Sequence, residues 1–469
     1  MDLELSPDVD ELWRKVRVPA LDAIARIYNY KYELAEGMVV ADPRVEKHGY
    51  KTLFDAPPSG SRSSLYSYED LSGLDDLYSY IKLNPIIAWK FLLPDIRESD
   101  PLDVSKVLLH EVAMIPVLLA ARYVAAHPIE SAIDVSHLRD LFDDQIEYLL
   151  SDDLRMDIYV PILGAAVETE GDFEDYSVVR LCDSQRALLG RVPHVSPRDQ
   201  RMMASATHAL KMSNAAASAG GCGSYFELVP YLSTIDSVDR FFEAASLANP
   251  SPVGYAQMLL EPIGWFGNID SNGNTSSVYL LRDYATRLDN YCRHAYPVSA
   301  DEISRINVYY GELGRGHPSL RVAARRYVAA WNRGDDEDRI VDLCIGLEAL
   351  LGGGSGGGEI IHRISLRAAV MLSRIGWGPS KETLSSIKDI YNYRSRVVHG
   401  VPGPHKKQLL YLDNTPIHAT RLAMATLSRI LDIALTTNGF HPDKVDDMFL
   451  YPVLDAAHVM DENSSSPAT

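Results

Sequence analysis

The sequence has little cysteine, and its few cysteines are far apart. Only four occur in 469 residues, namely Cys182, Cys222, Cys292 and Cys344. No two are close enough in the sequence to supply the paired ligands of a zinc site or a dense disulfide framework. We therefore expect no metal site, no cofactor and a reducing cytoplasm.

The chain also has no long uninterrupted apolar run. Its most apolar stretch, residues 104–126, contains Lys106, Glu111 and Arg122. Such interruptions favour a buried or amphipathic helix over a membrane span. The first residues, Met1–Asp8, are acidic where a secretory signal is basic. We expect a cytoplasmic protein with neither a secretory signal nor a membrane partner.

Positive charge is scarce, because 45 Lys and Arg stand against 64 Asp and Glu, a net charge of −19. This balance suppresses indiscriminate binding to polyanions such as RNA. The deficit is uneven: residues 318–437 hold 16 basic and 11 acidic side chains, a balance of +5, and the remainder carries −24. The basic stretch is either ordinary variation among solvated helices or a local face that admits a chosen substrate. Both alternatives stay open.

The length and the 46% hydrophobic content predict two or three domains in an α+β protein. We expect a mixed α/β N-terminal region at 1–150, an α+β middle domain at 151–313, an all-α helical bundle at 314–440 and a partly disordered C-terminal tail at 441–469. The N-terminal region has helical patterning at 10–32 and 103–127.

In the middle domain, residues 156–167 and 176–181 are typical of strands, and the turn Thr169–Asp172 between them predicts a hairpin. Further strands are expected at 225–229, 256–260 and 277–281, and helices at 200–213 and 237–248.

A run of helices is expected beyond the middle domain. Ser299 and Glu302 form a capping box for a helix to about Leu313, and Gly314–Pro318 then breaks the chain. Apolar periodicity beyond this break predicts an up-and-down bundle. Its helices are expected at 319–332, 336–351, 359–374, 381–399 and about 415–437. The glycine-rich stretch Gly352–Gly358 lacks the Lys and Ser/Thr of a phosphate-binding loop, so we expect a flexible connection there.

The most informative segment is Tyr391–Gly400, because it sets Arg394 and His399 five positions apart at the expected end of a helix. The spacing alone is weak evidence. With 32 arginines and 14 histidines in 469 residues, about one such pair arises by chance, and the chain has two. The other pair, Arg122 and His127, ends the apolar helix before Pro128, where basic residues are ordinary.

The context of the second pair is more specific. Three helical blocks occur in order: Asp338–Leu351, His362–Leu372 and Tyr391–Gly400. Together they resemble the Apea-like branch of the HEPN superfamily, over about residues 319–400. The resemblance implies a helical bundle, a homodimer and a metal-independent endoribonuclease, and it suggests a toxin or a bacterial abortive defence against phage. Other members of the superfamily only bind nucleotides or act as scaffolds.

Arg394 and His399 have the chemistry that such a reaction needs. Histidine transfers protons near neutral pH, and a guanidinium binds two phosphate oxygens at once. Five steps along an ideal helix leave two side chains about 140° apart, whereas Arg396 and His399 lie closer. Because Gly400 is expected to end the helix, His399 can curl around its terminus towards Arg394. The family pattern also implies Arg394.

Several neighbours are expected to assist. Ser395 and Arg396 are substrate-binding candidates, although Ser395 differs from the Asn, Asp or His of many HEPN members. Lys406 and Lys407 are equally consistent with a solvated loop or an RNA-backbone contact.

Two further residues are expected to support the site. Glu348 is expected either to orient an arginine through a buried ion pair or to be structural, with the structural role favoured. Tyr391, like Tyr393, is expected to pack in the helix interface more readily than to stack on a base.

The sequence therefore predicts a cytoplasmic HEPN endoribonuclease whose N-terminal two thirds sense a phage-derived or other trigger and restrain the bundle. Its partners would be RNA and a second copy, because each motif offers one histidine and two protons must move. The alternative is a non-catalytic HEPN module that binds RNA, a nucleotide or a partner protein.

Overall fold

The computed structural model describes residues 8–34, 71–90, 101–127, 132–151, 154–192, 195–220, 227–249, 251–263, 277–292, 295–353, 360–400, 409–412 and 415–455. Contacts divide the chain into two compact units. Unit 1 contains residues 1–159, 211–235 and 258–279, and unit 2 contains residues 160–210, 236–257 and 280–469. The described residues form a mixed α+β protein, which confirms the expected fold class. The sequence-based domain boundaries remain predictions.

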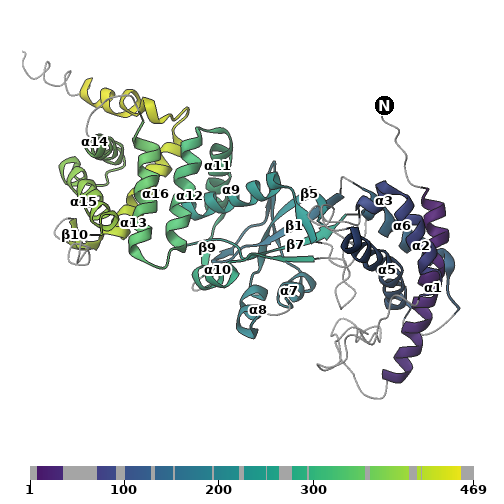
Figure 1. Cartoon of the computed structure of the whole chain (residues 1–469). Coiled ribbons are helices and arrows are strands. Elements are labelled where there is room, and N and C mark those ends of the chain that lie inside the picture. Colours follow the sequence, from purple (N-terminus) through teal and green to yellow (C-terminus); the bar gives the residue numbers. More distant parts are fainter. Residues whose placement is uncertain are drawn as a thin grey trace, which may run out of the picture. The chain divides into compact units, whose positions relative to one another are not determined.

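Among the described residues of unit 1, the helices are α1 (Val9–Leu34), α2 (Leu74–Leu83), α3 (Pro85–Lys90), α5 (Pro101–Ala126) and α6 (Val135–Leu150), with the start of α9 described below (Figure 1). Helix α1 starts where the Asp8 carboxylate accepts a hydrogen bond of 3.0 Å from the backbone N–H of Glu11. Its residues Leu12, Val16 and Ala20, four positions apart, are fully buried. The predicted helices at 10–32 and 103–127 are confirmed as α1 and α5.

Helix α5 is strongly apolar. Its stretch Val104–Val124 is long and apolar enough to cross a membrane by length and composition, and half of that stretch is buried inside the protein. Core helices of soluble proteins have the same character, so the membrane prediction stays untested.

One sheet has the strand order β3-β4-β5-β1-β7-β8, with β6 paired to β5. Its strands are β1 (Leu154–Pro161), β3 (Gly171–Asp172), β4 (Ser177–Arg180), β5 (His208–Gly220), β6 (Glu227–Pro230), β7 (Gln257–Pro262) and β8 (Ser277–Leu280). In β1, Met156, Ile158 and Val160 are fully buried and alternate with more exposed residues, as expected for a strand with one face in the core. A separate parallel pair joins β2 (Ala165–Val167) to β9 (Tyr296–Val298).

The predicted hairpin between residues 156–167 and 176–181 is wrong. Strand β4 pairs with β3 and lies beside β5, so β5 separates it from β1. The expected turn residues Gly171 and Asp172 themselves form β3. The chain reverses after β3, where the Phe173 N–H donates to the Tyr176 carbonyl at 2.8 Å, and pairing with distant segments determines which strands are neighbours.

The predicted helix at 200–213 is also wrong beyond Ala204, where α8 (Pro197–Ala204) ends. The chain then turns into β5, and backbone hydrogen bonds from distant segments hold its start. The N–H of Ile162 donates to the carbonyl of His208 at 3.0 Å, and that of Leu181 donates to Thr207 at 2.9 Å. These non-local bonds override the helical preference of a short Met- and Ala-rich stretch. The strands predicted at 225–229, 256–260 and 277–281 are confirmed as β6, β7 and β8.

Unit 2 also contains the helices α7 (Asp183–Leu189), α9 (Leu232–Ala248), α10 (Tyr284–Tyr291) and α11 (Ala300–Arg315). Helix α9 begins in unit 1 and was predicted at 237–248. The predicted capping box starts α11, because the Ser299 N–H donates to the Glu302 carboxylate at 2.9 Å and the Glu302 N–H donates to the Ser299 hydroxyl at 3.4 Å.

Five helices follow and pack together: α12 (Pro318–Asn332), α13 (Asp336–Leu351), α14 (Ile360–Ser373), α15 (Ser380–Val398) and α16 (Ala419–Thr436) (Figure 1). We call α11–α16 the helical bundle. The predicted helix positions are confirmed to within a few residues. Helices α13 and α16 approach closely at Gly346, where an added Cβ would meet the Leu427 side chain at 2.6 Å.

Two details of the bundle differ from the prediction. Residues Thr415–His418 form β11, which pairs with β10 (Leu409–Leu412), so α16 starts at Ala419 and the region is not all-α. Beyond α16, the turns Pro442–Lys444 and Asp446–Leu450 continue the ordered chain, with Val445 and Phe449 buried. The chain from 442 to 455 is therefore part of the described fold.

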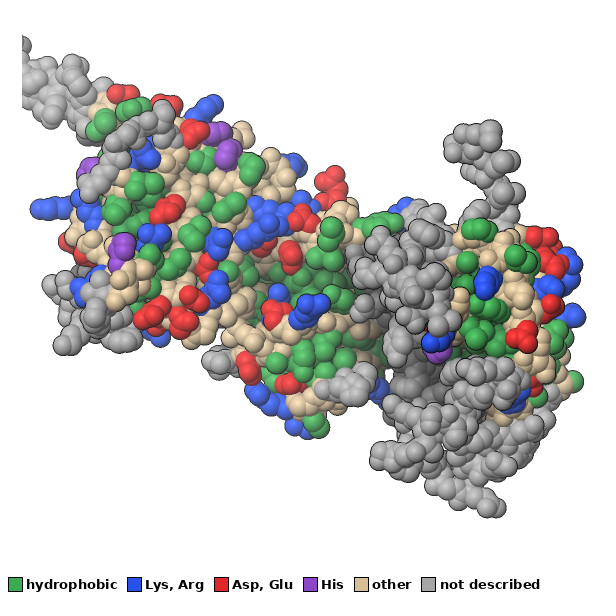
Figure 2. Space-filling view, in the orientation of Figure 1, with side chains coloured by type: hydrophobic (Ala, Val, Ile, Leu, Met, Phe, Trp, Pro, Cys, Tyr) green, Lys and Arg blue, Asp and Glu red, His purple; other side chains and the backbone are tan. Residues whose placement is uncertain are grey.

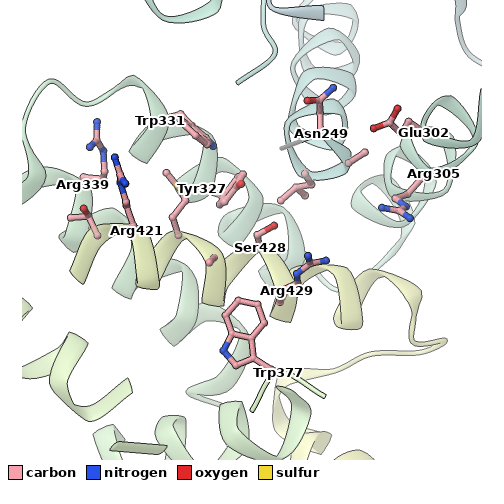
Figure 3. A pocket seen from close by; sticks show the side chains of 15 residues that line it. Asn249, Glu302, Arg305, Tyr327, Trp331, Arg339, Trp377, Arg421, Ser428 and Arg429 are labelled. Atoms are coloured by element: carbon pink, nitrogen blue, oxygen red, sulfur yellow. The ribbon is translucent and has the colours of Figure 1, made fainter. Parts of the chain in front are cut away.

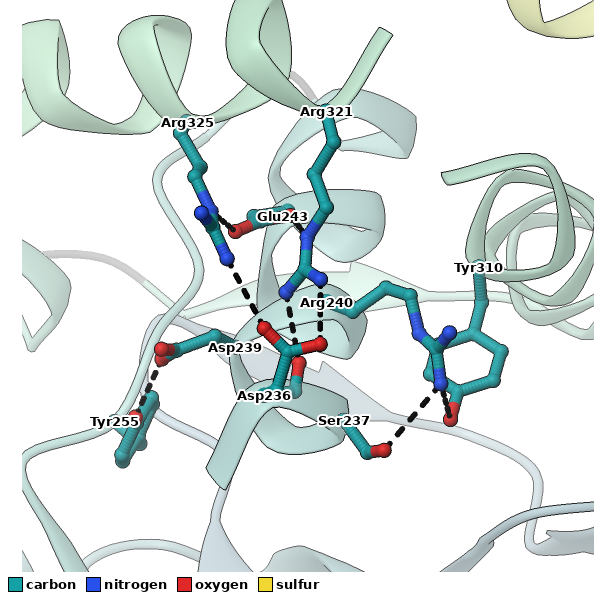
Figure 4. A network of polar contacts seen from close by, with 9 residues as sticks. All are labelled: Asp236, Ser237, Asp239, Arg240, Glu243, Tyr255, Tyr310, Arg321 and Arg325. Atoms are coloured by element: carbon teal, nitrogen blue, oxygen red, sulfur yellow. Dashed lines mark hydrogen bonds and ion pairs between the residues drawn. The ribbon is translucent and has the colours of Figure 1, made fainter. Parts of the chain in front are cut away.

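An ion-pair network joins α9 to α12 within unit 2 (Figure 4). Arg321 contacts Asp236 at 2.5 Å and Glu243 at 3.1 Å, and Arg325 contacts the same two carboxylates at 3.1 Å each. The hydrogen bond from Arg321 lowers the pKa of Asp236, whereas burial raises the pKa of Glu243 despite both arginines. The network fixes the part of α9 from Asp236 to Glu243 against α12.

Candidate functional site

The candidate catalytic segment is the C-terminal end of α15. The helix continues through Val398, and His399 is its C-cap, with its N–H bonded to the Ser395 carbonyl at 3.0 Å. Gly400 follows with a φ of 60°, a left-handed conformation that glycine adopts without strain. The predicted stop at His399 and Gly400 is therefore confirmed.

Arg394 is half-buried on α15. Burial raises the pKa of the Cys344 thiol on α13; Glu348 raises it further, and the Arg394 guanidinium opposes this. Both charged groups are thus within electrostatic reach of Cys344. The Nε atom of Arg394 is buried and has no hydrogen-bond partner in the described chain.

His399 is exposed, and its imidazole has no hydrogen-bond or ion-pair partner among the residues that the structure describes. Because α15 stays helical up to Val398, the ideal angular separation of about 140° between Arg394 and His399 applies to this chain. The C-cap φ and ψ of His399, −87° and 4°, lie in the bridge region, where the helix has ended. The place of the His399 side chain on α15 is set by the helical residues before it, so the backbone up to His399 does not bring the two side chains to one face.

The neighbouring candidates divide between surface and core. Ser395 and Arg396 are half-buried, and the Arg396 Nε atom has no partner among the described residues. Tyr391 is 2% exposed, and its hydroxyl donates to the Cys344 carbonyl at 3.3 Å, so it packs rather than stacking on a base. Lys406 and Lys407 lie outside the described residues.

The ion pair expected for Glu348 is not formed within the described ranges. Glu348 is half-buried on α13, and its backbone carbonyl accepts a hydrogen bond of 2.8 Å from the Gly352 N–H. Burial is the largest cause of the raised pKa of Tyr391, and the charges of Cys344 and Glu348 raise it further. The Arg394 guanidinium lowers the same pKa. Glu348 and Arg394 thus act on the same buried groups without touching.

The other Arg/His pair is held by structural contacts in unit 1. Arg122 donates to the Leu141 carbonyl at 2.9 Å, and burial lowers its pKa to about 10. The His127 ring stacks on Tyr123 with a centroid separation of 4.3 Å. Both side chains pack within unit 1, so Arg122 and His127 have a structural explanation that Arg394 and His399 lack.

A pocket of about 810 Å³ lies in unit 2 between the end of α9, helices α11, α12, α13 and α16, and the turn after α14 (Figure 3). Its lining combines basic and aromatic side chains: Arg305, Arg339, Arg421, Arg429, Tyr327, Trp331 and Trp377. None of these residues was a candidate in the sequence. A recognisable signal was the eight-residue spacing of Arg421 and Arg429, which sets both on one face of α16.

Basic side chains are spread over the bundle. Figure 2 shows Lys and Arg on the face in view, interspersed with Asp and Glu. The surplus of +5 at 318–437 is therefore not a continuous basic face in this view. Comparisons of the chain with family models, with curated proteins and with solved structures find no match. The family resemblance thus rests on the residues quoted above.

Proposed function

We propose that the chain is a metal-independent endoribonuclease of the HEPN type, with Arg394 and His399 as its catalytic residues. One observation carries the proposal: α15 ends at an exposed histidine without a described partner, one and a half turns after a half-buried arginine whose Nε is unpaired. A purely structural pair would be tied into the fold, as Arg122 and His127 are.

The reaction needs two proton transfers and positive charge on the phosphate. One imidazole takes the proton of the 2′-hydroxyl, whose oxygen attacks the adjacent phosphorus. A second imidazole, in its protonated form, gives a proton to the 5′-oxygen as the P–O bond breaks. The guanidinium binds the equatorial oxygens of the phosphorane. The products are a 2′,3′-cyclic phosphate and a 5′-hydroxyl end.

A second copy of the chain supplies the missing group. Each α15 carries one histidine at its end, and Arg394 and His399 of one helix diverge by about 140°. In a two-fold dimer, two α15 ends would meet near the axis and pool two histidines and two arginines in one cleft. The resemblance further suggests a role in abortive defence, in which the N-terminal region responds to a trigger.

The test is cleavage of total RNA by the purified full chain in the presence of a chelator. His399→Ala should slow cleavage at least about 100-fold, because a general acid or base contributes that much or more. The matched control is His362→Ala, which removes an exposed histidine from α14. Arg394→Ala is compared in the same way with Arg315→Ala, whose side chain is 77% exposed at the end of α11.

The sharing of the site is tested by mixing Arg394→Ala and His399→Ala chains. Partial recovery of cleavage would show that each chain lends what the other lacks. Normal cleavage by His399→Ala, or 5′-phosphate ends that disappear with chelator, would contradict the proposal. A folded wild-type protein that cuts no RNA and only binds it would instead support the non-catalytic alternative.

A further inference from the structure

The pocket of unit 2 has a surplus of positive charge. Arg305, Arg421 and Arg429 are exposed at its wall, and none of them makes an ion pair with a described carboxylate. The fourth guanidinium, that of Arg339, is already bonded to Asp336 at 2.8 Å and to two backbone carbonyls at 2.9 Å. Like charges around one concavity repel each other, and a bound anion relieves that repulsion.

One carboxylate lines the same pocket, but it is already engaged. Glu302 accepts hydrogen bonds of 2.9 Å from the N–H and the hydroxyl of Ser299 in the capping box of α11. Three arginines therefore remain for an incoming anion. Figure 3 shows Arg429 on α16 with Arg305 of α11 on its side of the pocket, and Arg421 farther along α16, beside Arg339.

Aromatic side chains form another part of the wall. Tyr327 and Trp331 lie one turn apart on α12, with ring centroids 6.5 Å apart and planes at 85°. Trp377 comes from the turn between α14 and α15 and is half-buried. Such rings offer flat surfaces on which a base can stack.

The Trp331 indole also has an unmet hydrogen bond. Its Nε1 atom is buried and has no partner in the described chain. A buried N–H group without an acceptor costs about 1–3 kcal/mol, so a ligand that brings an acceptor is favoured at this wall.

We infer that this pocket binds a nucleoside phosphate, with its phosphate groups along the wall lined by Arg305, Arg421 and Arg429 and the base among the aromatic rings. The volume of about 810 Å³ falls within the range of ligand sites, about 300–1,000 Å³. A simple inorganic anion would leave the aromatic wall unused, and an apolar ligand would leave the arginines uncompensated. A free nucleotide and the terminal nucleotide of an RNA strand share this chemistry. The inference does not depend on RNA cleavage by Arg394 and His399.

The experiment titrates the full chain with each of the four ribonucleoside triphosphates, following tryptophan fluorescence and heat of binding. At least one nucleotide should bind saturably, and at least about 10-fold more tightly than either tripolyphosphate or the uncharged nucleoside. Arg421→Gln and Arg305→Gln should each weaken binding about 10-fold or more, the value of a hydrogen bond to a charged group. Arg315→Gln, on the same helix as Arg305, removes an equal charge outside the pocket and should change nothing.

Further measurements distinguish a free nucleotide from an RNA end, and the pocket from the end of α15. Uridine hexanucleotides with a 5′- or a 3′-phosphate test whether the pocket binds the end of an RNA strand. If these hexanucleotides bind, the free nucleotides do not, and Arg421→Gln weakens hexanucleotide binding, then the natural ligand is an RNA end. Trp377→Ala should weaken nucleotide binding but not tripolyphosphate binding. His399→Ala should bind normally, which keeps this result distinct from the nuclease test. No saturable binding of any nucleotide or oligonucleotide overturns the inference, and so does equal binding of tripolyphosphate or equal loss with Arg315→Gln.

Discussion

The clearest stability prediction concerns Arg367 on α14, a buried guanidinium whose charge is balanced by Asp446. Arg367 is 3% exposed, and it contacts the Asp446 carboxylate through Nε at 2.8 Å and through Nη2 at 2.7 Å. Its Nη1 also donates to the carbonyls of Leu351 and Gly353 at 2.7 Å each. These contacts hold three segments together: the end of α13, α14 and the chain beyond α16.

We predict that Asp446→Ala destabilises unit 2 by about 2 kcal/mol. Removing one partner of a buried ion pair costs about 3–5 kcal/mol, because a charge is left buried without compensation. The cost here should be smaller, because the Asp446 side chain is 31% exposed and Arg367 keeps its two carbonyl acceptors. For a unit of this size, about 2 kcal/mol corresponds to a fall in Tm of about 4–8 °C.

The effect should depend on pH in a defined direction. The hydrogen bond from Arg367 lowers the pKa of Asp446. A carboxylate whose pKa is lowered by folding stabilises the folded state above its unfolded pKa of about 3.9, and this stability is lost as the pH falls through the lowered value. The stability difference between the wild type and Asp446→Ala should therefore be constant from about pH 8 to about pH 5 and shrink below about pH 4.

Thermal unfolding and hydrogen exchange of the α14 amides measure this effect. The matched control is Asp447→Ala, because Asp447 is the exposed neighbour of Asp446 in the same turn and carries the same charge. The control should change Tm by less than about 2 °C, the usual size of a surface effect. Equal shifts for the two variants, or a difference that grows as the pH falls, would refute the reasoning.

Two further predictions concern packing and cysteine reactivity. Gly254→Ala should lower the stability of unit 2 by at least about 1–3 kcal/mol, because its Cβ would lie 2.2 Å from the Tyr291 ring, whereas Gly334→Ala, with nothing within 4 Å, should be neutral in the same thermal melt. In the folded protein at pH 8, a thiol reagent should label the exposed Cys182 but not Cys344, which is buried and has a raised thiol pKa; mass spectrometry that finds rapid labelling of Cys344 before unfolding would show that this part of the core opens.

The bundle could be predicted from the sequence because its signals are local. The capping box at Ser299 and Glu302, the break near Pro318 and the 3.6-residue periodicity all act within one or two helical turns. The α+β class followed from the same local patterns. The strand order could not be predicted in this way, because it depends on pairing between segments such as Leu181 and Thr207 that are far apart in the sequence.

The pocket was beyond prediction for a related reason. The residues that line it are spread over the sequence from Leu247 to Arg429. Taken singly, its arginines look like ordinary surface residues and its aromatic residues look like ordinary packing residues. Only the fold brings Arg305 opposite α16 and sets Trp377 near the same space. The sequence places Arg421 and Arg429 on one face of α16, but only the fold shows which side chains line the same pocket.

Helix α15 ends where the sequence predicted, but this end does not bring His399 back to Arg394. The sequence predicted that the helix stops at His399, and the expectation that His399 curls back to Arg394 depended on that stop. The helix does stop there, and because it is helical up to Val398, the positions of Arg394 and His399 on α15 keep the ideal angular separation of about 140°. Arg394 is half-buried and within electrostatic reach of Cys344, whereas His399 is exposed to solvent. If these two residues serve one phosphate, the most direct arrangement is that each comes from a different copy of the chain. The geometry of a single helix end thus favours the shared site of the proposal, and the mixing experiment with Arg394→Ala and His399→Ala chains tests it.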